Sequence, residues 1–476
     1  MDFNRSDRVH PSMCVADIHE MSRLLFAQEF GDTTARSAMD EELRPLLRIF
    51  SVVEKMNTRR RIIAWPRSVN EAAREEMANF TGEWPYFPTA TDCVMPVKRK
   101  YARTADLKKF YQQFELRNKQ DYCFQAGTKI YALSTVPTGH VFPPYFAQTI
   151  LSSLRRAILS RWQNVDVTMW LDNIRVAADD EIVLDLVWQY MLAVFDDLGI
   201  TLGESTAITQ RYDFLGVTYD HTQASVAMAE KTVNKLRFIA NFMLRHDEPI
   251  YQGTCQKMFG ICAQAAALLG QQLAPYYHIF KYMRRVAKDS PGDKRTIWPS
   301  IRSLWSQWAL ALAGTTRFVN TDDKRQQLTL FTDASSHGFG AVLLGSGTTF
   351  SVGKEWDEEQ LATISGRFTQ AEANLHINAK ELLALKKALL LIPRHMLLNV
   401  DLHLRIDNTS ALAWIKKRRS RSFLPNSIVG DIAAIRELLG IEFTSVEYVS
   451  TDSNIADEAS RSMFSETTRK LVSSTS

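Results

Sequence analysis

Four acidic residues in the last third of the chain constrain its fold most, because they fall at strand ends and helix starts of one succession of elements. Residues 325–465 read as three strands, a helix, a strand, two helices, a strand and a final helix start. Asp333 ends the first strand, Glu381 lies in the first helix, Asp407 ends the fourth strand and Asp457 opens the last helix. This succession predicts an α/β domain with a mixed five-stranded sheet. The strands are expected at LTLFTDAS, GFGAVLLG, TTFSVGKEW, VDLHLRID and FTSVEYVS.

Strand ends and helix starts are where open sheets place their ligands. Four carboxylates gathered there would repel one another unless divalent cations bound between them, and Mg²⁺ prefers such oxygen ligands. Two ions at one site suit in-line cleavage of a phosphodiester. Taken singly, each acid is better explained as a cap: Asp333 in a turn, Asp407 before a helix and Asp457 in a first helical turn.

Taken together, the four acids lie in motifs that resemble a known family. The segments FTDASSHGFGAVL, AKELLAL, RIDNTSALAW and SNIADEASR are similar, in order and spacing, to the four motifs of the ribonuclease H (RNase H) domain of retroelement polyproteins. One departure concerns the loop before the last acid. Cellular RNases H carry a histidine there, whereas this chain reads SVEYVSTDSNIAD, as many retroelement domains do. The resemblance implies an RNase H that uses Asp333, Glu381, Asp407 and Asp457 as metal ligands.

The segment YARTADLKKFYQQFEL resembles the first catalytic motif of reverse transcriptases, in which an aspartate at a strand end is followed five residues later by an aromatic. Asp106 and Tyr111 occupy these places. The resemblance implies that Asp106 binds both Mg²⁺ ions and that the ring of Tyr111 excludes a ribose 2′-hydroxyl. Without its neighbours, Tyr111 would be read as a core aromatic.

Three further segments resemble reverse transcriptase motifs. ALSTVPTGHVFPPYFAQTIL is similar to the turn in which Thr138 and Gly139, after Pro137, would contact the nucleotide or the template base pair. RRRIIAWPRSVN is similar to the fingers motif, with Arg67 touching the incoming triphosphate. FLGVTY, from Phe214, resembles the hairpin that holds the primer.

The third catalytic motif departs from the family pattern. Members carry an aromatic, any residue and two aspartates, whereas this chain reads Trp170, Leu171, Asp172 and Asn173. Asp172 keeps its expected place as a second metal ligand, but the adjacent carboxylate is an amide. Polyproteins of DIRS-like and VIPER-like retrotransposons are the nearest relatives that the motifs indicate.

The motifs organise the chain into an α+β multidomain protein. The 476 residues are 45% hydrophobic and 23% charged, a composition typical of folded domains. We expect right-hand polymerase fingers and palm, then a helical thumb or connection, then the RNase H-like domain. The expected segments are an unassigned helical extension at 1–45, fingers and palm at 46–225, the thumb or connection at 226–320, the RNase H-like domain at 325–465 and a tail at 466–476.

Charge and cysteine content bear on partners and location. The net charge is only +4, but basic runs lie beside the motifs, including Lys416, Lys417, Arg418, Arg419 and Arg421. The five cysteines form no CxxC pair, the first residues are charged, and no uninterrupted apolar run reaches membrane-spanning length. An intracellular protein of the cytoplasm or nucleus, without a membrane, is expected.

The resemblance implies an RNA-directed DNA polymerase of a retrotransposon, with a tethered RNase H that degrades the RNA strand of RNA–DNA hybrids. Its partners would be an RNA template, a DNA primer, the hybrid and deoxynucleoside triphosphates. Its cofactors would be Mg²⁺, or Mn²⁺ in its place, with two ions at each active site. Two alternatives stay open: a nuclease whose polymerase half has decayed, and a non-catalytic RNA-binding scaffold. The four clustered carboxylates argue against the scaffold.

Overall fold

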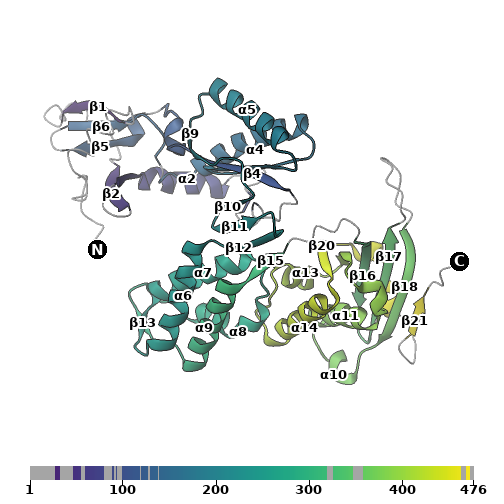
Figure 1. Ribbon diagram of the computed structural model, residues 1–476. Helices are drawn as coiled ribbons and strands as arrows, with labels where there is room; N and C mark the ends of the chain where they lie inside the picture. Colours follow the sequence, from purple (N-terminus) through teal and green to yellow (C-terminus); the bar gives the residue numbers. More distant parts are fainter. Residues whose placement is uncertain are drawn as a thin grey trace. The chain divides into compact units, whose positions relative to one another are not determined.

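The computed structural model describes residues 27–32, 47–54, 59–79, 88–89, 93, 99–117, 119–126, 129–137, 139–318, 325–346, 358–461 and 468–471 (Figure 1). The chain divides into two compact units, which are described separately. The first consists of Met1–Ala227 with Arg317–Val319, and the second of Met228–Thr316 with Asn320–Ser476. Within the described residues, no helix is both long enough and apolar enough to cross a membrane.

A four-stranded sheet forms the centre of the first unit. Its order is β7-β8-β4-β9, formed by Val165–Trp170, Asn173–Ala178, Tyr101–Leu107 and Leu202–Ser205. Buried and half-buried residues alternate along β7, as expected of a strand with one face on the core. β7 and β8 are an antiparallel pair joined at Leu171 and Asp172, and Leu171 has a φ of 52°.

Two long helices cover this sheet: α4 (Pro143–Arg161) and α5 (Glu181–Asp197). The side chain of Asp180 accepts hydrogen bonds from the backbone N–H groups of Ile182 and Val183, which fixes the start of α5. The buried residues of α5 recur at helical spacing and join the core of the sheet; they are Leu184, Val187, Trp188, Met191 and Phe195.

Shorter elements complete the first unit. They are a sheet β1-β6-β5 (Ala27–Asp32, Lys129–Leu133, Cys123–Ala126), a hairpin β2-β3 (Arg48–Glu54, Arg59–Trp65) and helix α2 (Arg67–Asn79). The expected helical extension at 1–45 is wrong for Ala27–Asp32, because these residues form strand β1 and pair with β6. The rest of that extension lies outside the described residues.

A further sheet has the order β10-β11-β12-β15, formed by Arg211–Phe214, Val217–Asp220, Ser225–Met228 and Thr316–Phe318. The segment FLGVTY makes the tight turn between β10 and β11. Leu215 and Gly216 occupy the turn with φ values of 50° and 85°, the left-handed pair that a two-residue hairpin requires.

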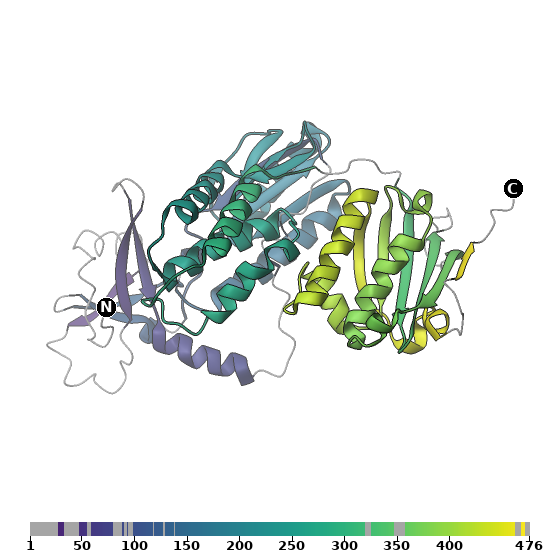
Figure 2. The same ribbon diagram turned by 90° about the horizontal axis from the view of Figure 1, so that it is seen from below.

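The second unit begins with a helical segment, Met228–Gly314. Its helices are α6 (Glu230–Arg245), α7 (Gln252–Leu268), α8 (Tyr277–Arg285) and α9 (Pro299–Gly314), with a short pair β13-β14 (Ile250–Tyr251, Lys294–Arg295). Figure 2 shows the helices lying side by side. Trp305 and Trp308 of α9 are fully buried and anchor this packing.

The remainder of the second unit contains a mixed six-stranded sheet of order β20-β19-β16-β17-β18-β21. The strands are β16 (Gln327–Ala334), β17 (Gly338–Ser346), β18 (Glu358–Arg367), β19 (Asp401–Ile406), β20 (Glu442–Tyr448) and β21 (Thr468–Leu471). β19 is parallel to both of its neighbours, and the other pairs are antiparallel. The third strand of the chain order is β18; the segment TTFSVGKEW, where the third strand was expected, lies outside the described residues.

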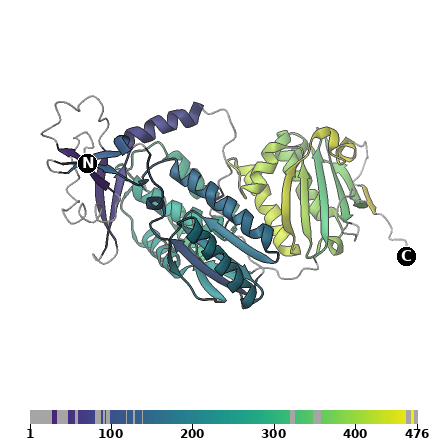
Figure 3. The same ribbon diagram turned by 90° about the horizontal axis from the view of Figure 1, so that it is seen from above.

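Helices pack on both faces of this sheet (Figure 3). On β17, Ala341 and Leu343 belong to the main core, whereas Val342 and Leu344 pack on the other face with Ala456. The main core includes residues of α11 (Ile377–Leu391), α13 (Thr409–Lys416) and α14 (Phe423–Leu439). The short helix α15 (Asp457–Arg461) follows Ala456 on the opposite face; α10 (Gln370–Ala373) and α12 (Arg394–Leu397) are short connecting helices.

Candidate active site

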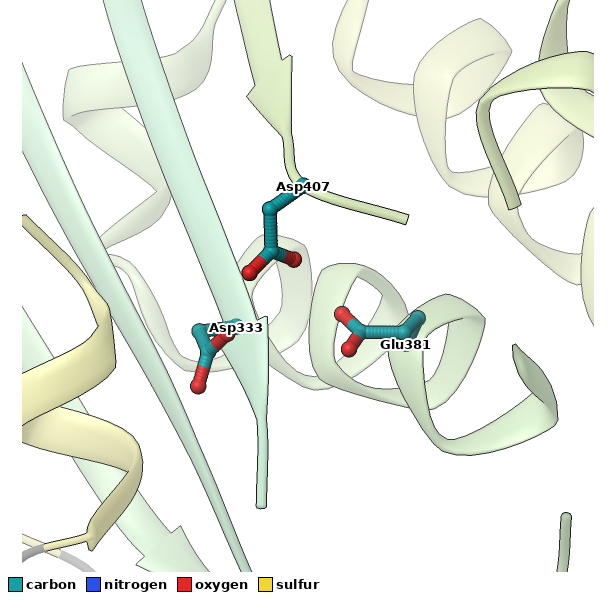
Figure 4. Close-up of side chains that lie close together, drawn as sticks. All are labelled: Asp333, Glu381 and Asp407. Carbon is teal, nitrogen blue, oxygen red and sulfur yellow. The ribbon is translucent and has the colours of Figure 1, made fainter. Parts of the chain in front are cut away.

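Two adjacent parallel strands and one helix bring acidic side chains together in the second unit. Thr332 of β16 is paired with Ile406 of β19, so the next residues, Asp333 and Asp407, lie at the same end of the two strands. Asp333 is still paired with Gly340 of β17, whereas Asp407 directly follows β19. Glu381 extends from α11 toward them, and Figure 4 shows the three carboxylates facing one another. Each offers one oxygen, and these oxygens all lie within 4.8 Å of one another. This is the spacing of ligands around a shared cation.

Burial raises the pKa values of two of these carboxylates, Asp333 and Glu381. Asp333 and Glu381 are each only 4% exposed. Burial, and then the charges of Asp333 and Asp407, raise the pKa of Glu381 from 4.5 to about 9. Burial and the charges of Asp407 and Asp457 raise the pKa of Asp333 from 3.8 to about 6, although a hydrogen bond from Ser460 opposes this change. The charge of Arg461, which lines the same cavity, opposes the rise at Asp333 but does not cancel it.

A divalent metal ion fits this arrangement. The buried Oε2 atom of Glu381 has no hydrogen-bond partner among the described residues, which leaves it available as a ligand. Oxygen ligands from two aspartates and one glutamate match the preference of Mg²⁺ and Mn²⁺. The cavity that the three acids line has a volume of about 490 Å³, enough for ions together with a phosphate group.

Asp457 lines the same cavity but is not one of the three clustered acids. Its Oδ1 accepts hydrogen bonds from Nε and Nη2 of Arg461, at 2.9 and 2.7 Å. Close packing brings α15, the helix that begins with Asp457, to the sheet. A Cβ on Gly340 would meet the carbonyl oxygen of Ala456 and the backbone nitrogen of Ser460 at 2.5 Å. The glycine of the first motif therefore allows α15 to reach the cavity.

Two polar residues that sequence reasoning did not single out hold the acids in place. The Nδ2 atom of Asn454, which is 4% exposed, donates to the carbonyl oxygen of Thr332 at 3.1 Å and to Oδ1 of Asp333 at 3.4 Å. The hydroxyl of Thr451 donates to Oδ2 of Asp407 at 3.1 Å. Asn454 lies inside the motif SNIADEASR, three residues before Asp457, so that motif contained the signal.

In the first unit, the structure brings Asp106 close to the turn that carries Asp172. Asp106 of β4 is paired with Asn173 of β8, and the backbone N–H of Leu107 donates to the carbonyl oxygen of Asp172 at 2.7 Å. Asp106 and Asp172 are both exposed, unlike the acids of the second unit. The Nδ2 atom of Asn173 donates to Oδ1 of Asp172 at 2.9 Å, so the amide holds the carboxylate beside it.

Tyr111 follows β4 in a short 3-10 turn, Phe110–Gln113. It is half-buried against the core of the β7-β8-β4-β9 sheet, with its ring centre 5.1 Å from that of Phe110. Burial, and then the charge of Asp172, raise the pKa of its hydroxyl. The residue is thus near Asp172 and also packs on the core, so the predicted sugar contact and the core alternative both remain open.

The other predicted nucleotide contacts have structural partners. A Cβ on Gly139 would meet the carbonyl oxygen of Ala64 in β3 at 2.5 Å, so here the glycine permits close approach of two protein backbones. Asn70, 3% exposed, joins α2 to the same loop by donating to the carbonyl oxygen of Gly139 and accepting from the N–H of Val141. Arg67 is exposed and paired with Glu71 at 2.9 Å. Thr138 lies outside the described residues.

Comparison with known proteins agrees with this geometry. Residues 323–426 match the family model of the RNase H-like domain found in reverse transcriptase. The match includes Asp333, Glu381 and Asp407 and ends before Asp457. None of the curated proteins is similar enough to match the chain.

Three solved structures of a foamy viral protease-reverse transcriptase are similar in fold, each at 14% sequence identity over 94% of this chain. One, a dRH form with double-stranded DNA, has a TM-score of 0.54 with 71% of its own chain covered. Another complex with double-stranded DNA has a TM-score of 0.53 and 85% coverage. The complex with an RNA/DNA hybrid has a TM-score of 0.51 and 55% coverage, so this chain spans about half of its length.

At this identity the structural likeness concerns the fold. The family match and the fold agree with the resemblance that the motifs predicted. Residues 323–426 thus match the RNase H-like domain found in reverse transcriptase, and the fold of the chain is similar to that of the foamy viral protease-reverse transcriptase.

Proposed function

We propose that this chain is the RNA-directed DNA polymerase of a retrotransposon and that its tethered RNase H cuts the RNA strand of RNA–DNA hybrids. The observation that carries the nuclease part is the triad of Asp333, Glu381 and Asp407, whose ligand atoms lie within 4.8 Å of one another in a cavity open to substrate. A cluster of buried carboxylates is costly to maintain, and a metal-dependent nuclease gives it a use.

Asp333, Glu381 and Asp407 would hold the metal ions, with Asp457 as a further ligand from α15. Two Mg²⁺ ions, or Mn²⁺ ions, would activate the attacking water and stabilise the leaving oxygen of the phosphodiester. The protein's own contribution is orientation. Asn454 fixes one oxygen of Asp333, and Thr451 fixes one oxygen of Asp407. These hydrogen bonds restrict the rotation of the two carboxylates and would orient them toward the ions.

The polymerase part rests on a second observation, the proximity of Asp106 to the turn of Asp172. We assign the first unit to fingers and palm and the helical segment to the thumb or connection. Asp106 and Asp172 would bind the metal ions, while Arg67, Tyr111, Thr138 and Gly139 would contact the nucleotide or template. The similar foamy viral enzyme is described in complexes with double-stranded DNA and RNA/DNA hybrid, which favours a primer, a template and their hybrid as partners.

Asn173 favours the rival in which only the nuclease is active. Its amide takes the place of the second motif aspartate and donates to Asp172, so the polymerase site has one carboxylate fewer. The scaffold alternative gives no use to the clustered carboxylates of Asp333, Glu381 and Asp407. The placement among DIRS-like or VIPER-like elements is likewise our proposal and rests on the motifs alone.

Two assays on the purified full chain test the proposal. The first follows cleavage of a labelled RNA–DNA hybrid with Mg²⁺ and with a chelator. The second follows extension of a DNA primer on an RNA template. We expect both activities, with slow extension. Cleavage without extension on any template would replace the proposal by the nuclease-only function, and failure of both assays would leave the scaffold.

A further inference from the structure

Lys380, which directly precedes Glu381 in α11, is a charged residue in the interior of the nuclease domain. It is only 6% exposed, and its Nζ atom donates to the carbonyl oxygen of Ser336 at 2.7 Å. Lys386 of the same helix is more exposed and is paired with Asp431, whereas Lys380 pairs with no carboxylate of the described residues. A buried ammonium is less favourable than a buried apolar side chain of the same length, which indicates that its charge has a role.

The ammonium of Lys380 acts on the loop that joins β16 to β17, which consists of Ser335–His337. Consecutive residues of a helix do not face each other, so Lys380 and Glu381 point in different directions. Ser335 and Ser336 line the acidic cavity beside Glu381. A hydrogen bond from a charged donor is stronger than one between neutral groups. Lys380 therefore fixes one wall of the cavity from behind.

The same loop holds the short helix α15. The hydroxyl of Ser335 donates to the carbonyl oxygen of Ser460 at 2.8 Å and accepts from the N–H of Gly338 at 2.9 Å. Ser460 is 2% exposed, and its own hydroxyl donates to the carbonyl oxygen of Asp457 at 3.0 Å. A Cβ on Gly338 would contact the carbonyl oxygen of Ser460, so the loop and the helix approach each other closely. A shift of the loop would therefore move the helix that carries Asp457.

Asp457 depends on these contacts more than the three clustered acids do. The clustered acids come from two paired strands and a long helix, which bring their ligand atoms within 4.8 Å of one another. Helix α15, in contrast, has only five residues, Asp457–Arg461, and a helix of that length has no stability of its own. Its contacts with Ser335 and Gly340 therefore decide where Asp457 lies in the cavity wall.

We propose that Lys380 is a positioning residue of the nuclease site, which acts on the fourth acid, Asp457. Its ammonium fixes the β16–β17 loop, the loop holds α15 through Ser335 and Ser460, and α15 sets Asp457 where it binds a second metal ion. This inference rests on the proposed nuclease function. Residues that orient a metal ligand from outside commonly change metal affinity by roughly tenfold to a hundredfold. The loss of Lys380 should therefore weaken the ion at Asp457 and spare the ion held by the clustered acids.

The test measures the binding of Mn²⁺ to the full chain by isothermal titration calorimetry. All proteins carry Asp106→Asn and Asp172→Asn, which remove the acidic ligands expected in the first unit. Lys380→Met keeps the length of the side chain and removes the ammonium, and Lys380→Arg restores a cation at the same position. Lys386→Met removes a lysine charge from the same helix at a more exposed position and is the matched control.

In Lys380→Met, the weaker of two Mn²⁺ sites should lose about tenfold in affinity, while the tighter site stays within about twofold of the parent. Lys380→Arg should recover most of this affinity, and Lys386→Met should match the parent. Unchanged affinity at both sites, an equal loss at both sites, or a parent that binds fewer than two ions would each overturn the proposal. Hybrid cleavage is measured separately. A parent that binds two Mn²⁺ ions but cuts no hybrid would remove the proposed function, and the titrations would still decide the role of Lys380 in metal binding.

Ser335→Ala tests the same connection from its other end and leaves Lys380 in place. It removes the hydroxyl that links the loop to α15. The weaker Mn²⁺ site should again lose about tenfold in affinity. The double variant with Lys380→Met should lose no more than the larger single effect, because both changes act through one loop. Circular dichroism checks folding, and if Lys380→Met does not fold, Ser335→Ala decides. Parent-like binding by folded Ser335→Ala, or additive losses in the double variant, would overturn the connection through the loop.

Discussion

The two acidic sites of this chain differ in burial and in charge. The nuclease site gathers Asp333, Glu381 and Asp407, two of them almost wholly buried. The polymerase-like site has the exposed Asp106 and Asp172, with an amide where a third carboxylate is expected. The buried acids have strongly raised pKa values because they are desolvated and repel one another. Under the proposed function, cations would relieve the repulsion at the first site, whereas Asn173 leaves the second site with one carboxylate fewer to attract them.

The largest effect is expected at the nuclease site. Asp333→Asn or Asp407→Asn should lower Mg²⁺-dependent hybrid cleavage by about a thousandfold or more, because each removes a charged metal ligand worth several kcal/mol in the transition state. Folding should be intact. A gel assay measures hybrid cleavage, and thermal denaturation checks that the variant is folded. Asp431→Asn, which changes an exposed acid of α14 paired with Lys386, is the control. Unchanged cleavage by Asp333→Asn would contradict the assignment.

Tyr111 tests whether the polymerase-like site selects its sugar. If its ring excludes the 2′-hydroxyl, Tyr111→Ala should raise ribonucleotide incorporation, relative to deoxynucleotides, by roughly tenfold to a hundredfold. Single-nucleotide incorporation measures the ratio. Tyr190→Ala, at another half-buried tyrosine on the same core, controls for lost packing. A variant that unfolds would assign Tyr111 to the core.

Asn173 tests the difference in charge directly. Two unit charges about 4 Å apart interact by roughly 4 kcal/mol at an effective dielectric near 20, and a fraction of that, about 1.4 kcal/mol, is tenfold in rate. Asn173→Asp should therefore raise primer extension in Mg²⁺ at least tenfold and leave hybrid cleavage unchanged. Asn241→Asp on the exposed face of α6 is the matched control. Equal extension by the natural protein and the variant would make the charge argument wrong.

Glu381 tests the stability of the fold, without a change in activity as the readout. Its carboxyl has a pKa of about 9 in the folded chain and an ordinary value of 4.5, so the folded state holds the proton more tightly. Without metal, the unfolding free energy should then fall by up to about 1.4 kcal/mol per pH unit between these values. Glu381→Gln removes the contribution of Glu381 to this pH dependence of the unfolding free energy. In a chelator the variant should be more stable than the natural chain near pH 8. Below pH 4.5, the ordinary pKa of the carboxyl, the two proteins should not differ in this way. Denaturant titrations at several pH values measure this, and identical pH profiles would contradict it.

Local patterns carried much of the nuclease prediction. Alternating apolar residues marked β16 and β19, and an aspartate lies at or next to the end of each strand, so the sequence predicted the places of Asp333 and Asp407. The prediction failed where pairing is distant in sequence. Ala27–Asp32 has little strand character of its own and becomes a strand by pairing with β6, about a hundred residues later.

What the sequence by itself determined is the set of chemical groups and their order: four nuclease acids, Asp106 and Asp172, and the amide at Asn173. Tertiary structure decided which of them meet. Parallel pairing of β16 with β19 and the packing of α11 bring three acids within 4.8 Å, while Asp457 pairs with Arg461. It also placed Gly139 against β3. These outcomes depend on contacts between residues far apart in the chain, whose burial and charge no local pattern specifies.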